Sequence, residues 1–306
     1  MVSLDKEVQV NYTNSVNKAL QFIDQNLDTN LSLETISKVA CFSSFHFHRI
    51  FKAVTHETLN AYITRKRIEK AASVLMRKPE VSITELSVLF GFNGNSSLTR
   101  AFKKYYGVSP SEFRKQKISR FSKISKVESK NGQELVAFDE YICSIDHLKN
   151  WIGMNAKIEI KHMTHVELAY VTSIGVQGIT KAYDTLIKWA TPLELLKYPD
   201  TKMVTIYHDS FKTTNPEKVR MSACITLANP LKVSGNIGLT SIPAGKFIVG
   251  SFVIGIIEFE KSWNALFVWM AENGYKKADR APFEIYHNDY RTHPEQKCMV
   301  DFYIPI

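Results

Sequence analysis

A motif that occurs twice constrains this chain more than any other feature of its sequence. Residues 32–42 align with residues 82–92 at an offset of 50, and residues 47–52 align with residues 98–103 at an offset of 51. Each copy shows a short amphipathic helix, a tight turn and a second helix with basic residues, which is the layout of a helix-turn-helix. Because the second helix of that motif enters the DNA major groove, two joined copies predict an all-α domain that reads two successive groove segments.

The distribution of charge supports the same interpretation. Residues 1–120 contain 18 Lys and Arg against 10 Asp and Glu, whereas residues 121–306 contain 21 against 20. A basic excess beside the repeated motif is suited to releasing counterions from DNA phosphates. A solvated basic face without a partner is the alternative, and the coincidence with the motif favours DNA.

The remaining composition predicts a cytoplasmic protein without a structural metal or a cofactor. The four cysteines are far apart and lack the spacing of zinc ligands, which is typical of a reduced chain. Asp5, Lys6 and Glu7 occupy the place where a signal peptide needs an apolar core. The longest apolar-rich run, residues 247–257, is too short to span a bilayer. We therefore expect no membrane partner.

Apolar spacing and helix-capping residues place the helices of the first half. The predicted helices include residues 16–27, a first recognition helix at 45–54, a connecting helix at 59–78 and a second recognition helix at 96–106. On the connecting helix, Arg65, Lys66 and Arg67 form a basic cluster. The sequence leaves two roles open for this cluster, contact with DNA phosphates or solubility alone.

These residues resemble the DNA-binding domain of the AraC/XylS transcription regulators over about residues 10–117. The signature end of that domain runs from Gly91-Phe92 through residues 100–103 to residues 107–110 and Arg114. In the family, outward residues of both recognition helices read base edges in adjacent segments of the major groove. Carried over by position, the resemblance implies these base-reading residues: Phe45, His48, Arg49, Asn95, Ser96, Thr99 and Arg100.

The chemistry of these positions supports the transfer unevenly. Arg49 and Arg100 can each make a bidentate contact to guanine or bind a phosphate. Phe45 can press on a thymine methyl group. The glycine at position 94 and the small side chain of Ser96 depart from the family pattern. They predict weaker base contacts for the second recognition helix than for the first.

A second duplication follows a predicted linker at residues 118–155. From residue 156 onward, strand and helix patterns repeat at offsets of 79 to 80; residues 206–209, for example, match residues 285–288. Each unit reads as strand-helix-strand-strand, so the second half predicts an α+β domain. Such a pair normally packs about a pseudo-two-fold axis, with both helices on one face of a joined sheet and a cleft between the halves.

Glu284 is the residue that breaks this internal symmetry, since the equivalent position in the first repeat is Thr205. On a strand, Glu284 and Tyr286 point to the same face. A carboxylate on an aromatic sheet face is costly to bury alone and is suited to a cationic or hydrogen-bonding ligand. The aromatic residues that we expect to complete such a site are Tyr286, Tyr207, Trp263 and Tyr170. The alternative is a glutamate that faces solvent on an edge strand.

Residues 156–306 resemble the GyrI-like effector-binding domain of bacterial regulators. The matching segments are residues 158–175, 282–289 and 301–305. In that family an acidic residue in the region of Glu284 contacts the ligand, so the resemblance implies an effector site there. The order of the two domains, with the DNA-binding module first, is also familiar.

Together these features predict a transcription regulator that binds double-stranded DNA and is controlled by a cationic or hydrophobic small molecule, with RNA polymerase as a further candidate partner. We expect no enzyme activity, because no catalytic triad, metal-ligand cluster or phosphate-binding glycine loop is present in the sequence. Two alternatives stay open. The second domain could be a small hydrolase in which Glu284 activates water. The protein could also be an architectural DNA binder without an effector.

Overall fold

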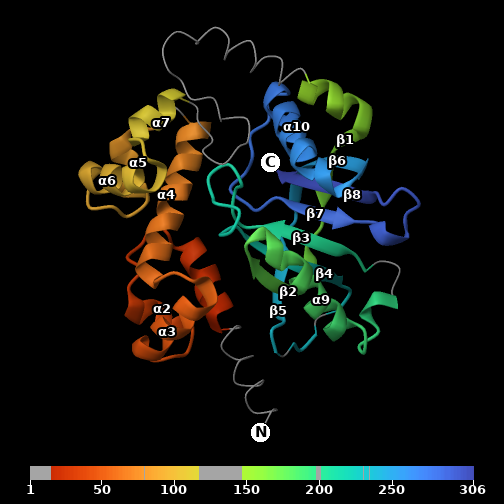
Figure 1. Ribbon diagram of the computed structural model, residues 1–306, viewed down its shortest axis with the longest axis horizontal. Helices are drawn as coiled ribbons and strands as arrows, with labels where there is room; N and C mark the ends of the chain where they lie inside the picture. The colour runs from red at the N-terminus through yellow and green to blue at the C-terminus, as the bar shows by residue number, and fades with distance from the viewer. Residues whose placement is uncertain (1–14, 79, 117–146, 198–200, 230, 234) are drawn as a thin grey trace. The chain divides into compact units, whose positions relative to one another are not determined.

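The computed structural model describes residues 15–78, 80–116, 147–197, 201–229, 231–233 and 235–306 (Figure 1). Their contacts define two compact units: residues 15–116 with 210–219 and 235–238, and the other described residues from 147 onward. Residues 15–116 are all-α and the second unit is α+β, which confirms the predicted fold class. The predicted domain start at residue 10 and most of the predicted linker, residues 118–146, lie outside the described residues.

The helices of the first unit form two helix-turn-helix motifs around a central helix. A helix over residues 15–25 is followed by α2 (Leu33–Val39), α3 (Ser44–Thr55), α4 (Leu59–Arg77), α5 (Ile83–Leu89), α6 (Asn95–Tyr106) and α7 (Pro110–Gln116). The pairs α2–α3 and α5–α6 are the two motifs, and α4 connects them (Figure 1). The starts of both recognition helices lie within one residue of the predicted positions.

Local side-chain caps explain where most of these helices begin. The side chains of Ser32, Ser43, Thr58 and Ser82 accept backbone N–H groups at the starts of α2, α3, α4 and α5. Glu85 completes a capping box with Ser82, so two backbone donors at the start of α5 are satisfied reciprocally. Helix α6 differs because its N-cap, Gly94, has no side chain to accept a hydrogen bond.

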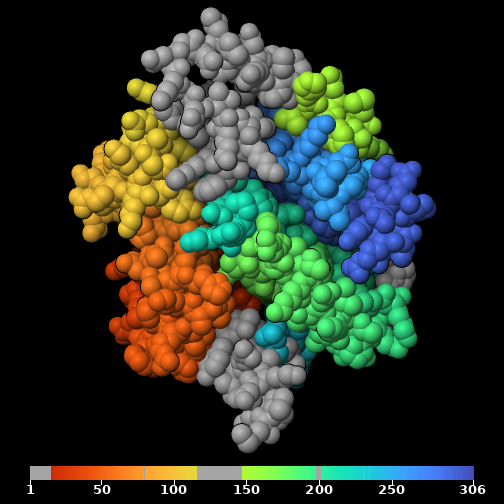
Figure 2. All heavy atoms as spheres, viewed as in Figure 1, coloured from red at the N-terminus to blue at the C-terminus, as the bar shows by residue number. Residues whose placement is uncertain are grey.

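Each motif has its own hydrophobic core, and α4 contributes to both. Phe47 and Phe51 of α3 pack with Ile63 of α4 in the first core. Phe102 of α6 packs with Ile68 of α4 in the second core. In the space-filling view the orange part of this unit directly borders its yellow part (Figure 2). One helix therefore carries both motifs, with the change from one core to the other near its middle.

The second unit is built on one sheet of eight strands with two main helices. In chain order its elements are β1 (Ala156–Met163), β2 (Val166–Ile174), α9 (Ile179–Ala190), β3 (Met203–Tyr207), β4 (Arg220–Leu227), β5 (Gly238–Ile242), β6 (Gly245–Ile254), α10 (Phe259–Glu272), β7 (Phe283–Tyr286) and β8 (Cys298–Pro305). The strand order across the sheet is β1-β6-β8-β7-β3-β4-β2-β5.

The sheet shows the predicted duplication and an exchange of strands between the repeats. The predicted strand-helix-strand-strand units are β2-α9-β3-β4 and β6-α10-β7-β8. An additional strand opens each repeat, and β1 pairs with β6 while β5 pairs with β2. At the centre, β3 pairs with β7 so that Thr205 lies opposite Glu284. Because these two residues are equivalent in the repeats, the pseudo-two-fold axis passes between them.

Residues 147–155 fall within the predicted linker but form a helix that packs into the second unit. Ile152 is only 5% exposed and joins the core around Leu266 of α10. The indole Nε1 of Trp151 donates to Ser262 Oγ at 3.2 Å. The compact second unit therefore begins before residue 156. Leu148, Trp151 and Ile152 have helical spacing, but the sequence pattern did not show this packing, because the segment makes its contacts with residues far along the chain.

Two further observations concern the chemistry of the described ranges. None of their helices is long and apolar enough to cross a bilayer. Cys41, Cys224 and Cys298 are free thiols, and no cluster of three or more His, Cys, Asp or Glu side chains in these ranges could hold a metal ion.

Candidate DNA-binding surface and effector site

Helix α3 presents its predicted base-reading residues on an outward face. Phe45 is 76% exposed, Arg49 is exposed and His48 is half-buried beside them. The guanidinium carbon of Arg49 lies 5.9 Å from the centre of the Phe45 ring. Residues four apart on a helix are neighbours, so this pair forms one surface. The buried stripe of the helix is complete without it, because Phe47 and Phe51 are both 0% exposed.

Helix α6 also presents its predicted base-reading residues outward, but one of their side chains is already engaged. Asn95, Ser96 and Arg100 are exposed and Thr99 is half-buried. The amide of Asn95 donates to Thr84 Oγ1 at 2.8 Å and accepts from Ser87 Oγ at 3.1 Å. These bonds hold the start of α6 against α5 where Gly94 supplies no cap. Asn95 therefore has a structural task that its position in the sequence did not reveal.

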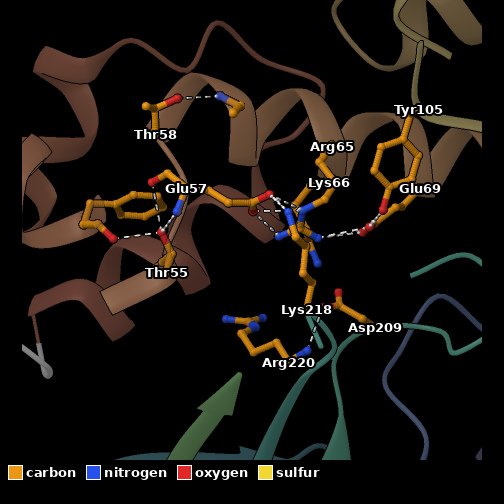
Figure 3. Close-up of polar contacts among 12 residues, drawn as sticks. Thr55, Glu57, Thr58, Arg65, Lys66, Glu69, Tyr105, Asp209, Lys218 and Arg220 are labelled. Carbon is orange, nitrogen blue, oxygen red and sulfur yellow. Dashed lines mark hydrogen bonds and ion pairs between the residues drawn. The ribbon is translucent and has the colours of Figure 1, made fainter. Parts of the chain in front are cut away.

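The basic cluster on α4 is not a surface for phosphates at two of its three positions. Arg65 is 4% exposed and Lys66 is 2% exposed. The guanidinium group of Arg65 lies between Glu57, at 2.7 Å, and Glu69, at 3.0 Å (Figure 3). Lys66 Nζ lies 3.3 Å from Asp24 Oδ1. Both open interpretations of the cluster were wrong for these residues, because the charge pattern alone does not show which carboxylates fold against it.

This ion-pair network joins the end of α3 to the second recognition helix. Glu57 directly follows α3, and Tyr105 of α6 donates its hydroxyl to Glu69 at 2.9 Å (Figure 3). Burial raises the pKa of Glu57, but hydrogen bonds and charge attraction from Arg65 outweigh it and hold this pKa below its usual value. Burial and the Glu69 carboxylate raise the pKa of Tyr105. Removing one partner from such a network leaves a buried charge uncompensated.

Glu284 lies at the centre of the second unit and is fully enclosed. It is 0% exposed and lies on β7, between β8 and β3. Its Oε1 accepts from Trp263 Nε1 at 2.7 Å and from Tyr207 Oη at 2.8 Å, and its Oε2 accepts from Tyr286 Oη at 2.5 Å. This geometry removes the alternative of a solvent-facing glutamate on an edge strand. Three of the four predicted aromatic partners therefore contact the carboxylate directly.

Burial raises the pKa of the Glu284 carboxyl to about 7, although hydrogen bonds from Tyr286, Trp263 and Tyr207 each lower it. No Lys or Arg side chain of the described residues forms an ion pair with it. Neutral donors stabilise a carboxylate less than a cation does, so the low-dielectric surroundings dominate. The group is consequently poised between its charged and neutral forms near neutral pH.

Tyr183 belongs to the same cluster and was not among the predicted site residues. Its hydroxyl lies 2.8 Å from Thr205 Oγ1, and that oxygen lies 3.2 Å from Tyr286 Oη. The duplication carried the signal for this residue, because Tyr183 in α9 aligns with Trp263 in α10. Each helix thus supplies one aromatic hydrogen-bonding group to the residue at the two-fold axis beneath it.

Tyr170 was wrongly predicted to lie in this site. It pairs across the sheet with Cys224, and Cys224 also pairs with Val204. Val204 pairs in turn with Ile285. Directly paired residues project from the same face of a sheet, so Tyr170 lies on the face of Ile285, opposite to Glu284. Burial nevertheless raises its pKa to about 12, because that face is a hydrophobic core of its own.

A shallow hollow in the second unit lies apart from this cluster. It has a volume of about 400 Å³ and is lined mainly by residues of β6 and β8, including Phe252 and Asp301, together with His287. Glu284 is not among its lining residues. The carboxylate is enclosed by aromatic side chains instead.

Comparison with known families identifies both halves of the chain. Residues 36–116 match a model described as a helix-turn-helix domain, and residues 156–306 match the GyrI-like small molecule binding domain. The TetD protein of transposon Tn10 from Escherichia coli is 33% identical over 117 residues, which are 38% of this chain and 84% of TetD. The multiple antibiotic resistance protein MarA of Escherichia coli is 34% identical over 100 residues, 33% of this chain and 78% of MarA.

The chain belongs to the AraC family of transcription regulators. It is an AraC-type DNA-binding regulator that carries a GyrI-like small molecule binding domain. This confirms the family resemblance of each half. TetD and MarA align with 38% and 33% of this regulator, and the family model assigns its second domain.

Solved structures of low similarity span the same parts of the AraC-family chain. The C-terminal domain of EcmrR is 19% identical with a TM-score of 0.41, covering 49% of this chain and 96% of that domain. EcmrR in its DNA complex, from the structure of EcmrR-RPo, is 16% identical with a TM-score of 0.43, covering 89% of this chain and 98% of EcmrR. Likeness at this level carries no argument about residues or ligands.

Proposed function

We propose that this AraC-family protein is controlled by an organic cation that binds at Glu284, and that it reads DNA through α3 and α6. RNA polymerase is the further partner that such a regulator requires, because its output is a change in transcription. Control requires that the effector distinguish two states of the protein that differ in DNA binding. The proposal has a DNA part and an effector part, which are tested separately.

The DNA part is supported by the surfaces of the recognition helices. Phe45 and Arg49 on α3, and Ser96 and Arg100 on α6, are exposed while the stripes beneath them are buried. Exposed arginines on recognition helices are suited to guanine or phosphate contacts. If the helices enter successive major-groove segments, their contacts are centred about 10–10.5 bp apart. Footprinting of the full chain on selected DNA measures this spacing.

One observation carries the effector part: a carboxylate that is 0% exposed and has only neutral hydrogen-bond partners among the described residues. A buried carboxylate without a cation is costly, and a cationic ligand would compensate it. Trp263, Tyr207 and Tyr286 surround it with aromatic faces that suit the apolar groups of an organic cation. The acid at position 284 and the threonine at position 205 make this site asymmetric, so one cation per chain is expected.

Because the pKa of Glu284 is raised to about 7, the proposed affinity depends on pH. A cation favours the ionised carboxylate, so binding releases a proton when the solution pH is below that value. Affinity for a permanently charged ligand should therefore rise as the pH increases from 6 to 8, by up to about tenfold per pH unit while the group is mostly protonated.

The experiment is a thermal-shift screen of the full chain with organic cations and hydrophobic amphiphiles, followed by calorimetric titration of the best hit. Glu284→Gln keeps the size and hydrogen-bonding capacity of the side chain and removes its charge. We expect this variant to bind a cationic hit at least tenfold more weakly, since a cation–π contact alone contributes about 0.5–2 kcal/mol. Chromatography of the hit after incubation distinguishes a bound effector from a hydrolysed substrate.

Glu260→Gln is the matched control, because Glu260 is an exposed glutamate on α10 of the same unit. It should bind the hit with wild-type affinity, and both variants should bind DNA like the wild type without ligand. Equal affinity of wild type and Glu284→Gln for the cation would remove Glu284 from the site. Release of a hydrolysis product would show that the hit is a substrate of this domain and not its effector.

A further inference from the structure

Arg67 of α4 makes contacts that its neighbours in the basic cluster do not make. Its guanidinium group donates to three backbone carbonyls: Nε to Leu27 at 2.9 Å, Nη2 to Thr29 at 2.6 Å and Nη1 to Gly91 at 3.0 Å. Leu27 and Thr29 belong to the turn that follows the helix over residues 15–25. Gly91 belongs to the turn between α5 and α6. One side chain therefore holds both the turn that leads into the first motif and the turn inside the second motif.

The position of Arg67 along α4 matches this bridging role. The first hydrophobic core uses α4 residues up to Ile63, and the second core uses α4 residues from Ile68 onward. The two cores have no member in common, so apolar packing alone fixes each motif to α4 but not directly to the other. Arginine suits the junction because its planar guanidinium offers five donors in a fixed geometry.

The turn at Gly91 shows a second, independent sign of the same contact. Gly91 has a φ of +61°, and a Cβ atom built there would lie 2.9 Å from Arg67 Nη2. The equivalent turn residue of the first motif, Cys41, has a φ of +60° and carries an exposed side chain. The left-handed backbone therefore does not by itself require glycine in this turn. What distinguishes the second turn is the guanidinium group that lies against it.

We propose that Arg67 is a positioning residue that sets the spacing and angle between α3 and α6, and thereby the half-site spacing that the protein accepts in DNA. It acts on backbone carbonyls and not on bases, so it would determine the arrangement of the two half-sites without changing the bases read in either. This inference rests on the proposed reading of DNA by both helices. The network of Arg65 with Glu57 and Glu69 is a second connection between the motifs, on the same helix.

The experiment is in vitro selection from a random-sequence DNA pool with the full-length wild type, Arg67→Gln and Arg67→Lys. Affinities are then measured on the selected site, on sites with one base pair inserted or deleted between the halves, and on a single half-site. We expect Arg67→Gln to select the same half-site sequences with a broader range of spacings. Its affinity for the wild-type site should fall at least tenfold, while affinity for a half-site stays within twofold of the wild type.

Salt dependence separates positioning from a direct phosphate contact. A lost phosphate contact lowers the slope of log affinity against log salt by about 0.9 and weakens full sites and half-sites alike. A positioning role leaves the slope unchanged, and Arg67→Lys, which keeps the charge but not the fork of donors, still accepts altered spacings. Lys38→Gln is the charge control, because Lys38 is an exposed residue of α2 that pairs with the nearby Glu34. It should leave the spacing preference unchanged.

Gly91→Ala tests the contact from its other end if Arg67→Gln shows a loss of helical circular dichroism. Its methyl group displaces the guanidinium, so it should broaden the accepted spacing, whereas Cys41→Gly at the equivalent turn should not. Wild-type spacing preference in Arg67→Gln, Arg67→Lys and Gly91→Ala overturns the inference, as does an equal loss on full sites and half-sites. A wild-type protein that selects a single half-site overturns the two-helix reading itself, and the inference with it.

Discussion

The two duplications of this chain have diverged in opposite places. The copies of the helix-turn-helix keep equivalent buried residues, since Phe51 and Phe102 correspond to each other and are both 0% exposed. They differ on the outward faces, where Phe45 of α3 corresponds to Ser96 of α6. The repeats of the second unit differ in their interior instead. There Thr205, 2% exposed, faces Glu284, 0% exposed, across the two-fold axis.

The difference teaches where a duplicated fold can change its chemistry and what the change costs. Divergence on an exposed helix face alters what is recognised and leaves the core intact, because surface substitutions usually change stability by less than about 0.5 kcal/mol. Divergence at the buried two-fold axis gives one repeat an ionisable group, Glu284, that the other repeat lacks. That creates an asymmetric site at the expense of stability, because an enclosed carboxylate loses its hydration.

The largest expected effect tests that cost at Glu284. The folded unit holds the carboxyl proton up to about pH 7, whereas the unfolded chain releases it near pH 4.5. Stability of the second unit should therefore fall as the pH rises through this range, by about 3 kcal/mol in total. Glu284→Gln should lack this loss. Urea unfolding followed by tryptophan fluorescence reports on this unit, because all 4 tryptophans lie in it. Parallel pH profiles of the two proteins would contradict the interpretation.

The next effect concerns the exposed arginines that both helix-turn-helix copies retain. Arg49→Ala and Arg100→Ala should each weaken specific DNA binding by about 1–3 kcal/mol if the residue makes a bidentate base contact, and relax the preference at one base pair. Thermal unfolding should be unchanged, because the buried stripes of α3 and α6 do not include them. Binding titrations on the selected site and its single-base variants measure this. Unchanged affinity and specificity in both variants would end the two-helix reading.

A smaller effect is expected at Tyr183 and Thr205, which are the counterparts of Trp263 and Glu284 in the first repeat. Tyr183→Phe removes the hydrogen bond to Thr205 and should destabilise the unit by about 1 kcal/mol. Affinity for a cation should stay near the wild-type value, whereas Trp263→Phe, which removes a donor to Glu284, should change it. Fluorescence-monitored unfolding and calorimetry give the two quantities. A cation affinity equally sensitive to both variants would mean that the ligand occupies both halves.

The smallest effect compares the two recognition surfaces directly. Phe45→Ala removes an exposed aromatic ring that can press on a thymine methyl group, and should weaken specific binding by about 1 kcal/mol. Ser96→Ala, at the equivalent position, should change the free energy of specific binding by only a few tenths of the Phe45→Ala effect. Competition binding on the selected site resolves the difference. A larger loss for Ser96→Ala would reverse the predicted ranking of the helices.

Much of the fold followed from local patterns in the sequence. The positions of α3 and α6 and the common face of Glu284 and Tyr286 depend on neighbouring residues, and the sequence predicted them. The helix at residues 147–155 did not follow, nor did the task of Asn95 in holding α6 against α5. Both depend on partners that are distant in the sequence or in another element.

The sequence by itself determined that the chain carries two duplications. It also determined that the first lies in a basic region and that one repeat of the second carries an acidic residue, Glu284, where the other has Thr205. Only the tertiary structure decided which charges are buried and which faces meet. Arg65 and Arg67 are two residues apart in one basic cluster, yet Arg65 lies between carboxylates and Arg67 binds carbonyls of the turn before α2 and of the turn between α5 and α6. Alternation along β2 shows which residues share a face with Tyr170, but it does not show which face of the sheet that is. The register of three strand pairs places Tyr170 on the face away from Glu284. The physical reason is that periodicity and capping are set by neighbours along the chain, whereas pairing and burial are set by contacts between distant segments.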